Sequence, residues 1–140
     1  MTIGTLTLSI VLAGCLLQPD SAVAPHKAWR TAQCLVTAQA SFLPKPEDRQ
    51  HFVDIASGWV LSRVPQAREI TAMGVHGATG ISRLECDMGG AGVFNPQDAV
   101  IVELRGLVDQ PPALFRAVVT IRPADGWVID GSYIRAMFPQ

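Results

Sequence analysis

Charged residues are scarce in this chain. Only 16% of the 140 residues are Asp, Glu, Lys or Arg, and eleven cationic residues nearly balance twelve anionic ones. The cations are scattered from Lys27 to Arg135, whereas binding to a polyanion depends on clustered cations that displace counterions. We therefore expect no nucleic-acid partner. The apolar fraction of 49% excludes a disordered chain, and the length suits one compact domain.

The motifs of metal and phosphate sites are also missing. The sequence has no C-x-x-C and no H-x-x-x-H, and its histidines are widely separated, at His26, His51 and His76. No lysine follows the glycine cluster Gly89–Gly92, although a phosphate-binding loop needs one. Ser57 lacks the first glycine of a nucleophile elbow. We expect neither a metal ion nor a cofactor.

The N-terminal apolar run is too short for a membrane span. No charged residue occurs from Ile3 to Leu17, which is about 15 residues against the roughly 20 that a bilayer requires, and Pro19 ends the run. A run of this length is typical of a signal peptide. Within it, Leu12-Ala13-Gly14-Cys15 resembles the lipobox of bacterial lipoproteins.

The resemblance to a lipobox implies a diacylglyceryl group on Cys15 and cleavage just before this residue. It also implies a protein anchored by lipid in the cell envelope and facing the periplasm. Leu16 is not the aspartate that often retains such proteins at the inner membrane, which favours the outer membrane.

Two other interpretations of this segment stay open. No Lys or Arg precedes Cys15, and Ala22-Val23-Ala24 has the small-x-small form of an ordinary secretory cleavage site, which would give a soluble periplasmic or secreted protein. An uncleaved membrane anchor is the third possibility. In each case we expect residues 1–24 to be a signal segment with a short linker, and residues 25–140 to form a single domain.

Two cysteines remain in that domain. Cys34 and Cys86 make an even pair, and an even pair outside the cytoplasm indicates a disulfide. The bond would close a loop of roughly 50 residues, which the chain-entropy model values at about 4 kcal/mol. The alternative is two unpaired buried thiols.

Helical spacing dominates the first half of the domain. Between Ala28 and Leu43, apolar residues recur at intervals of three and four, which predicts an amphipathic helix. Pro46 then begins a second helix of about 18 residues. Glu47 and Asp48 suit its first turn, because carboxylates interact favourably with a helix N-terminus.

The second half of the domain has a pattern that predicts strands. We expect two short strands at Arg68–Val75 and Ile81–Asp87, then a loop containing Gly89–Gly92 and Asn95-Pro96. Three longer strands should form a meander, at Ala99–Val108, Leu114–Arg122 and Trp127–Met137. The predicted fold is an α+β domain with two N-terminal helices packed on one face of a curved antiparallel sheet.

The ending Asp125–Gly131 resembles the last turn and strand of nuclear transport factor 2-like domains. A cystatin-like or secretion-system periplasmic domain is the alternative. The first resemblance implies a conical pocket between helices and sheet, with His51, Asp54, Asp130 and Tyr133 as its possible polar occupants. Asp54 lies between two apolar residues, so burial would raise the pKa of its carboxyl group and suit it to general-base catalysis.

Two functions follow from these observations. The lipobox, with no catalytic spacing, predicts a non-catalytic envelope lipoprotein that binds a protein partner as an accessory or assembly factor. Its recognition surface would be the polar face of the two central strands, comprising Glu103, Arg105, Arg116 and Arg122. The alternative is a small-ligand carrier or a cyclase- or isomerase-type enzyme with a conical pocket.

Overall fold

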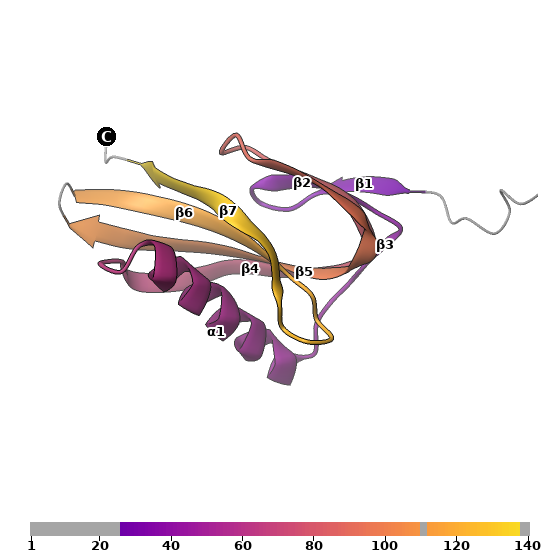
Figure 1. Cartoon of the computed structure of the whole chain (residues 1–140), viewed down its shortest axis with the longest axis horizontal. Coiled ribbons are helices and arrows are strands. Elements are labelled where there is room, and N and C mark those ends of the chain that lie inside the picture. Colours follow the sequence, from indigo (N-terminus) through magenta and orange to yellow (C-terminus); the bar gives the residue numbers. More distant parts are fainter. Residues whose placement is uncertain (1–25, 110–111, 138–140) are drawn as a thin grey trace, which may run out of the picture.

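The domain is built on one antiparallel sheet. The computed structural model describes the backbone of residues 26–109 and 112–137, with side chains described as far as Gly131. The predicted signal segment, with Cys15 and its lipobox, lies outside these residues. Seven strands pair in the order β1-β2-β4-β5-β6-β7, and β3 pairs with β4 (Figure 1). The elements are β1 (Lys27–Arg30), β2 (Cys34–Ala38), β3 (Ala40–Phe42), α1 (Pro46–Arg63), β4 (Arg68–Cys86), β5 (Ala91–Asp109), β6 (Pro112–Ile121) and β7 (Val128–Met137).

The predicted helix over Ala28–Leu43 is wrong, and with it the fold class with two N-terminal helices. This segment forms β1, β2 and β3. Burial in β2 alternates, with Cys34, Val36 and Ala38 inside the molecule. An apolar run of this kind fits a period of two as well as a period of 3.6. Pairing with β4, far along the chain, selects the strand. The described domain is therefore mostly β.

The second predicted helix is confirmed as α1. It has 18 residues, Pro46 lies in its first turn with Glu47 and Asp48, and Arg63 lies in its last turn. The residues that it buries are Phe52, Ala56 and Val60, which are four apart and share one face. Among the described elements α1 is the only helix, and no helix in this part of the chain is long and apolar enough to cross a membrane.

The central strands are longer than expected. The two short strands predicted between Arg68 and Asp87 are one strand, β4, whose register shifts mark bulges. The predicted glycine loop shrinks to a tight turn, because β5 already begins at Ala91 and includes Asn95-Pro96. The meander of β5, β6 and β7 is confirmed.

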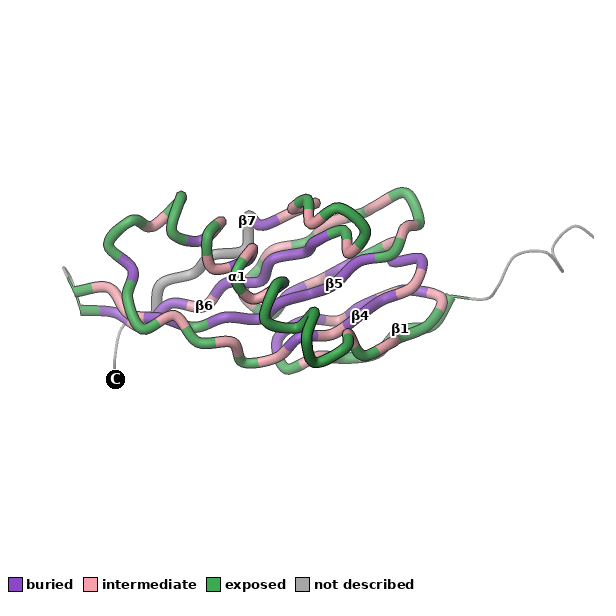
Figure 2. The backbone as a smooth tube through the Cα atoms, turned by 90° about the horizontal axis from the view of Figure 1, so that it is seen from below, coloured by how far each residue is buried: buried purple, intermediate pink, exposed green. Residues whose placement is uncertain are grey.

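Both faces of this sheet bury apolar side chains. One face, with Leu104, Phe115 and Val119, packs against Phe52 and Val60 of α1. The other face, with Ile101 and Val118, packs against Cys34 and the residues around it. Figure 1 shows how this second layer arises: the distal part of the β4–β5 ribbon curls back and carries β2 and β1 over the sheet, away from α1. Buried segments run through the middle of β4, β5 and β6 in Figure 2.

Candidate functional site

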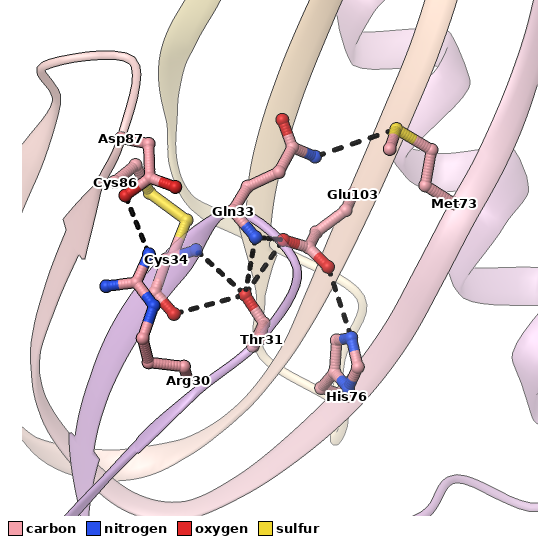
Figure 3. Close-up of a disulfide and its surroundings, with 9 residues drawn as sticks. All are labelled: Arg30, Thr31, Gln33, Cys34, Met73, His76, Cys86, Asp87 and Glu103. Atoms are coloured by element: carbon pink, nitrogen blue, oxygen red, sulfur yellow. Dashed lines mark hydrogen bonds and ion pairs between the residues drawn. A yellow bond between two sulfur atoms is a disulfide. The ribbon is translucent and has the colours of Figure 1, made fainter.

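The strands β1 and β2 with the turn between them, residues 27–38, form a layer that we call the flap. The predicted disulfide joins it to the sheet. Cys34 of β2 lies directly opposite Cys86 of β4, and their sulfur atoms are bonded. An ion pair between Arg30 and Asp87, with a distance of 2.7 Å, joins the same two segments at the surface. Figure 3 shows these contacts around the turn of the flap.

Glu103 of β5 attaches the turn of the flap to the sheet through hydrogen bonds. Its Oε2 atom accepts hydrogen bonds from the Thr31 hydroxyl and from the backbone N–H of Gln33, each 2.8 Å long. Its Oε1 atom lies 3.1 Å from Nε2 of His76. An ionised carboxylate only accepts hydrogen bonds, so this nitrogen carries the proton. The Thr31 hydroxyl also accepts a bond from the N–H of Cys34, as Figure 3 shows.

The carboxyl group of Glu103 is fully buried and ionised. Burial by itself would raise its pKa, but the hydrogen bonds from His76, Thr31 and Gln33 outweigh that effect and hold the pKa below its ordinary value. The sequence had placed this residue on an exposed recognition face. Its burial removes it from any such surface and makes it part of the attachment of the flap.

The expected polar face therefore divides into two parts. The flap covers the half that contains Ile101, Glu103 and Val118. Beyond the edge of the flap the same face is open, and here Arg105 is exposed and Arg116 is half-buried. The two arginines lie directly opposite each other in the β5–β6 ladder. We call Arg105 and Arg116 with their strand neighbours Leu107 and Leu114 the arginine face.

Neither arginine of this face is neutralised. Among the residues that the structure describes, no carboxylate forms an ion pair with Arg105 or Arg116. Arg105 also lines a cavity of about 310 Å³ with Glu69, Thr71, Leu107 and Leu114. The carboxylate of Glu69 forms its ion pair with Arg68 and not with Arg105. In contrast, carboxylates pair with four other arginines, namely Arg30, Arg68, Arg83 and Arg122.

Arg122 does not belong to the arginine face. It lies just after β6, six residues from Arg116, which is about 20 Å along a strand. Its guanidinium group is 2.6 Å from the carboxylate of Asp125. This ion pair lowers the pKa of Asp125 and raises that of Arg122. The register instead brings the backbone of Arg135 in β7 opposite Arg116.

Of the residues expected in a conical pocket, the three whose side chains the structure describes, His51, Asp54 and Asp130, do not line one cavity together. His51 and Asp54 are exposed on α1, where Asp54 accepts a hydrogen bond from Gln50. Because Asp54 is exposed, it lacks the buried environment that was expected to suit it to general-base catalysis. Tyr133 lies in β7 opposite Val118, and its side chain is outside the described part. Asp130 lines a cavity of about 740 Å³ with Trp59 and Trp127, apart from both His51 and Asp54.

His76 is a residue of this region that no sequence motif singles out. It lines a groove of about 520 Å³ with Trp29, Ser41, Phe42, Leu43 and Gly77. Nothing in the local pattern around His76 marks it as the partner of a buried carboxylate. The described residues contain no cluster of three or more His, Cys, Asp or Glu that would hold a metal ion. No protein-family model, curated protein or solved structure matches the chain.

Proposed function

We propose that the chain is an envelope lipoprotein, anchored through Cys15 and facing the periplasm, whose domain binds the acidic surface of a protein partner through the arginine face. It acts as a non-catalytic accessory or assembly factor. The observation that supports this function most directly is the pair of arginines, Arg105 and Arg116, which lie opposite each other and form no ion pair with a described carboxylate.

Like charges placed directly opposite each other in an antiparallel ladder destabilise a sheet. An isolated domain gains nothing from this arrangement, whereas two carboxylates on the acidic surface of a partner would neutralise both guanidinium groups. Arginine suits that task, because its planar donors match the two oxygens of a carboxylate. The neighbouring leucines, Leu107 and Leu114, add half-buried apolar surface of the kind found at the centre of an interface.

Two observations support the envelope. The sequence Leu12-Ala13-Gly14-Cys15 resembles a lipobox at all four positions. The disulfide between Cys34 and Cys86 is of the kind that persists outside the cytoplasm. Together they favour a chain that is exported and then anchored, with outer-membrane attachment favoured by Leu16.

Photo-crosslinking in intact cells tests the partner. A photoreactive residue at position 107 should crosslink to a protein in wild type, and the product should disappear when Arg105→Glu and Arg116→Glu are combined. Arg49→Glu is the matched control, because Arg49 is exposed on α1, on the other side of the sheet. A product that persists unchanged in the double variant would contradict the proposed surface.

The lipid anchor is tested by the intact mass of the chain recovered from the membrane fraction of a Gram-negative host. We expect a chain that starts at Cys15 and carries acyl groups, and an unmodified chain for Cys15→Ala. A chain that starts at Pro25 without acyl mass would establish secretory cleavage and remove the lipoprotein from the proposal.

A further inference from the structure

We propose that the corner of the domain where the chain enters β1 rests on the surface of an anionic phospholipid bilayer. This corner comprises Lys27, Trp29, Leu43 and Lys45, and we call it the entry corner. The inference rests on the proposed lipid anchor and deepens it, because it states how the anchored domain is oriented.

Leu43 is the most exposed large apolar residue that the structure describes, with 85% of its surface accessible. It follows β3 directly and lines the groove that contains Trp29 and Phe42. An exposed leucine beside an aromatic groove is apolar surface that the domain itself leaves uncovered. Tryptophan is suited to the boundary between hydrocarbon and water, since its ring is apolar and its N–H is polar.

Each of the two chain segments that carry this apolar surface also carries a lysine close to it in sequence. Lys27 lies two residues before Trp29, and Lys45 lies two residues after Leu43. Both are exposed, and no ion pair engages either of them within the described residues. The nearest carboxylates along the chain, Glu47 and Asp48, belong to the first turn of α1, where the helix N-terminus stabilises their charge. Free lysines around apolar side chains match a bilayer with negative headgroups.

The entry corner is close in sequence to the proposed lipid anchor, and for this reason we expect its partner to be the membrane. A chain that begins at a lipidated Cys15 reaches Lys27 through eleven residues, 15–25, and His26. Twelve extended residues span at most about 40 Å, so the anchor confines this corner to a thin layer above the bilayer. Confinement raises its effective concentration at the surface, so that a contact too weak to bind a free domain becomes populated. Figure 1 shows the start of β1 on the same side of the domain as β3.

Hydrogen exchange on the acylated full chain tests the contact. The chain is reconstituted into vesicles of phosphatidylethanolamine with phosphatidylglycerol, in wild type and in the variants Leu43→Asp and Val93→Asp. Val93 is the matched control, since it is an apolar residue with 75% exposure in the first part of β5. We expect amide exchange in residues 26–30 and 41–45 to be at least about threefold faster in Leu43→Asp than in wild type or in the control.

A second comparison isolates the charge. In vesicles of phosphatidylcholine alone, and in the combined variant Lys27→Glu and Lys45→Glu, the protection of the same residues should fall. Equal exchange in wild type and Leu43→Asp, in a chain whose mass confirms acylation, would overturn the entry corner and leave the anchor intact. Protection that appears only after another protein is added would also overturn it, in favour of a protein contact. An unacylated chain would overturn the anchor and, with it, this inference.

Discussion

Glu103 shows how one side chain can hold two layers of a small domain together. Its carboxylate belongs to the sheet, whereas two of its donors, the Thr31 hydroxyl and the Gln33 N–H, belong to the flap. A buried charge is stable only when several donors surround it. The carboxylate and the flap therefore depend on each other, because loss of either leaves buried polar groups without partners.

Replacement of Glu103 by alanine should destabilise the domain by about 1–3 kcal/mol, since the Gln33 N–H and Thr31 hydroxyl lose a buried acceptor. The change is measured by urea unfolding of the purified protein at neutral pH. Asp54→Ala is the control, because Asp54 is exposed and its loss should cost far less. Equal stability of the two variants would show that the flap is not held by this carboxylate.

The pH dependence of stability has a definite sign at this residue. The folded-state pKa of Glu103 is lowered, so the stabilisation is complete above the ordinary pKa of a glutamate, about 4.3. It is lost as the pH falls through the lower folded-state value. Urea unfolding between neutral pH and pH 3 should show a smaller acid-induced loss in Glu103→Gln than in wild type. An identical pH dependence in both proteins would contradict the assignment.

At the scale of the element, the path of β4 depends on glycines, because their missing side chains let neighbouring atoms lie close to the β4 backbone. A Cβ atom on Gly77 would lie 2.4 Å from the Phe42 ring and 2.6 Å from the Phe42 backbone oxygen, across the β3–β4 pair. From the sequence, two strands were expected here, Arg68–Val75 and Ile81–Asp87, with Gly77 and Gly80 between them. These glycines lie instead within one strand, where the absence of a side chain permits tight packing and bulges.

Two glycine variants should therefore change stability in opposite directions. Gly77→Ala should destabilise the domain by about 1–3 kcal/mol, because the backbone oxygen of Phe42 cannot move aside without breaking strand pairing. Gly58→Ala should stabilise it by about 0.5–1 kcal/mol, because Gly58 lies within α1 and its Cβ would meet nothing within 4 Å. Thermal melting of both variants checks the pair, and a shift of the same sign in both would contradict this explanation.

At the scale of the whole molecule, the domain is a sheet covered by α1 on one face and by the flap on half of the other. The uncovered half is the arginine face, and the entry corner lies at the start of β1. The proposed partner and the proposed membrane contact thus use separate surfaces. A domain lying on a bilayer by its entry corner would keep the arginine face available.

The disulfide should stabilise the domain mainly by lowering the conformational entropy of the unfolded chain. Cys34 and Cys86 are 52 residues apart, and the chain-entropy model values closure of such a loop at about 4 kcal/mol. The double variant Cys34→Ala and Cys86→Ala should lose about 2–5 kcal/mol of unfolding free energy, measured by urea unfolding without reductant. Adding reductant should weaken wild type but leave the double variant unchanged. A wild-type protein insensitive to reductant under unfolding conditions would contradict a stabilising bond.

Local signals were sufficient for the parts of the fold that depend on neighbouring residues. The proline and carboxylates at the start of α1, with its apolar spacing, marked the helix within a few residues of its true bounds. The clean alternation of side chains in β5 and β6 marked the meander. The cysteine pair indicated the disulfide, although parity alone does not prove that the bond forms.

Contacts distant in the chain decided the rest. The segment Ala28–Leu43 fits two periods, and the pairing of β2 and β3 with the distant β4 makes it three strands and not a helix. Glu103 alternates like an exposed residue, yet the flap that buries it comes from 70 residues earlier. Periodicity reports only which face of a strand a residue occupies. Whether that face meets water or another layer depends on where the remainder of the chain packs.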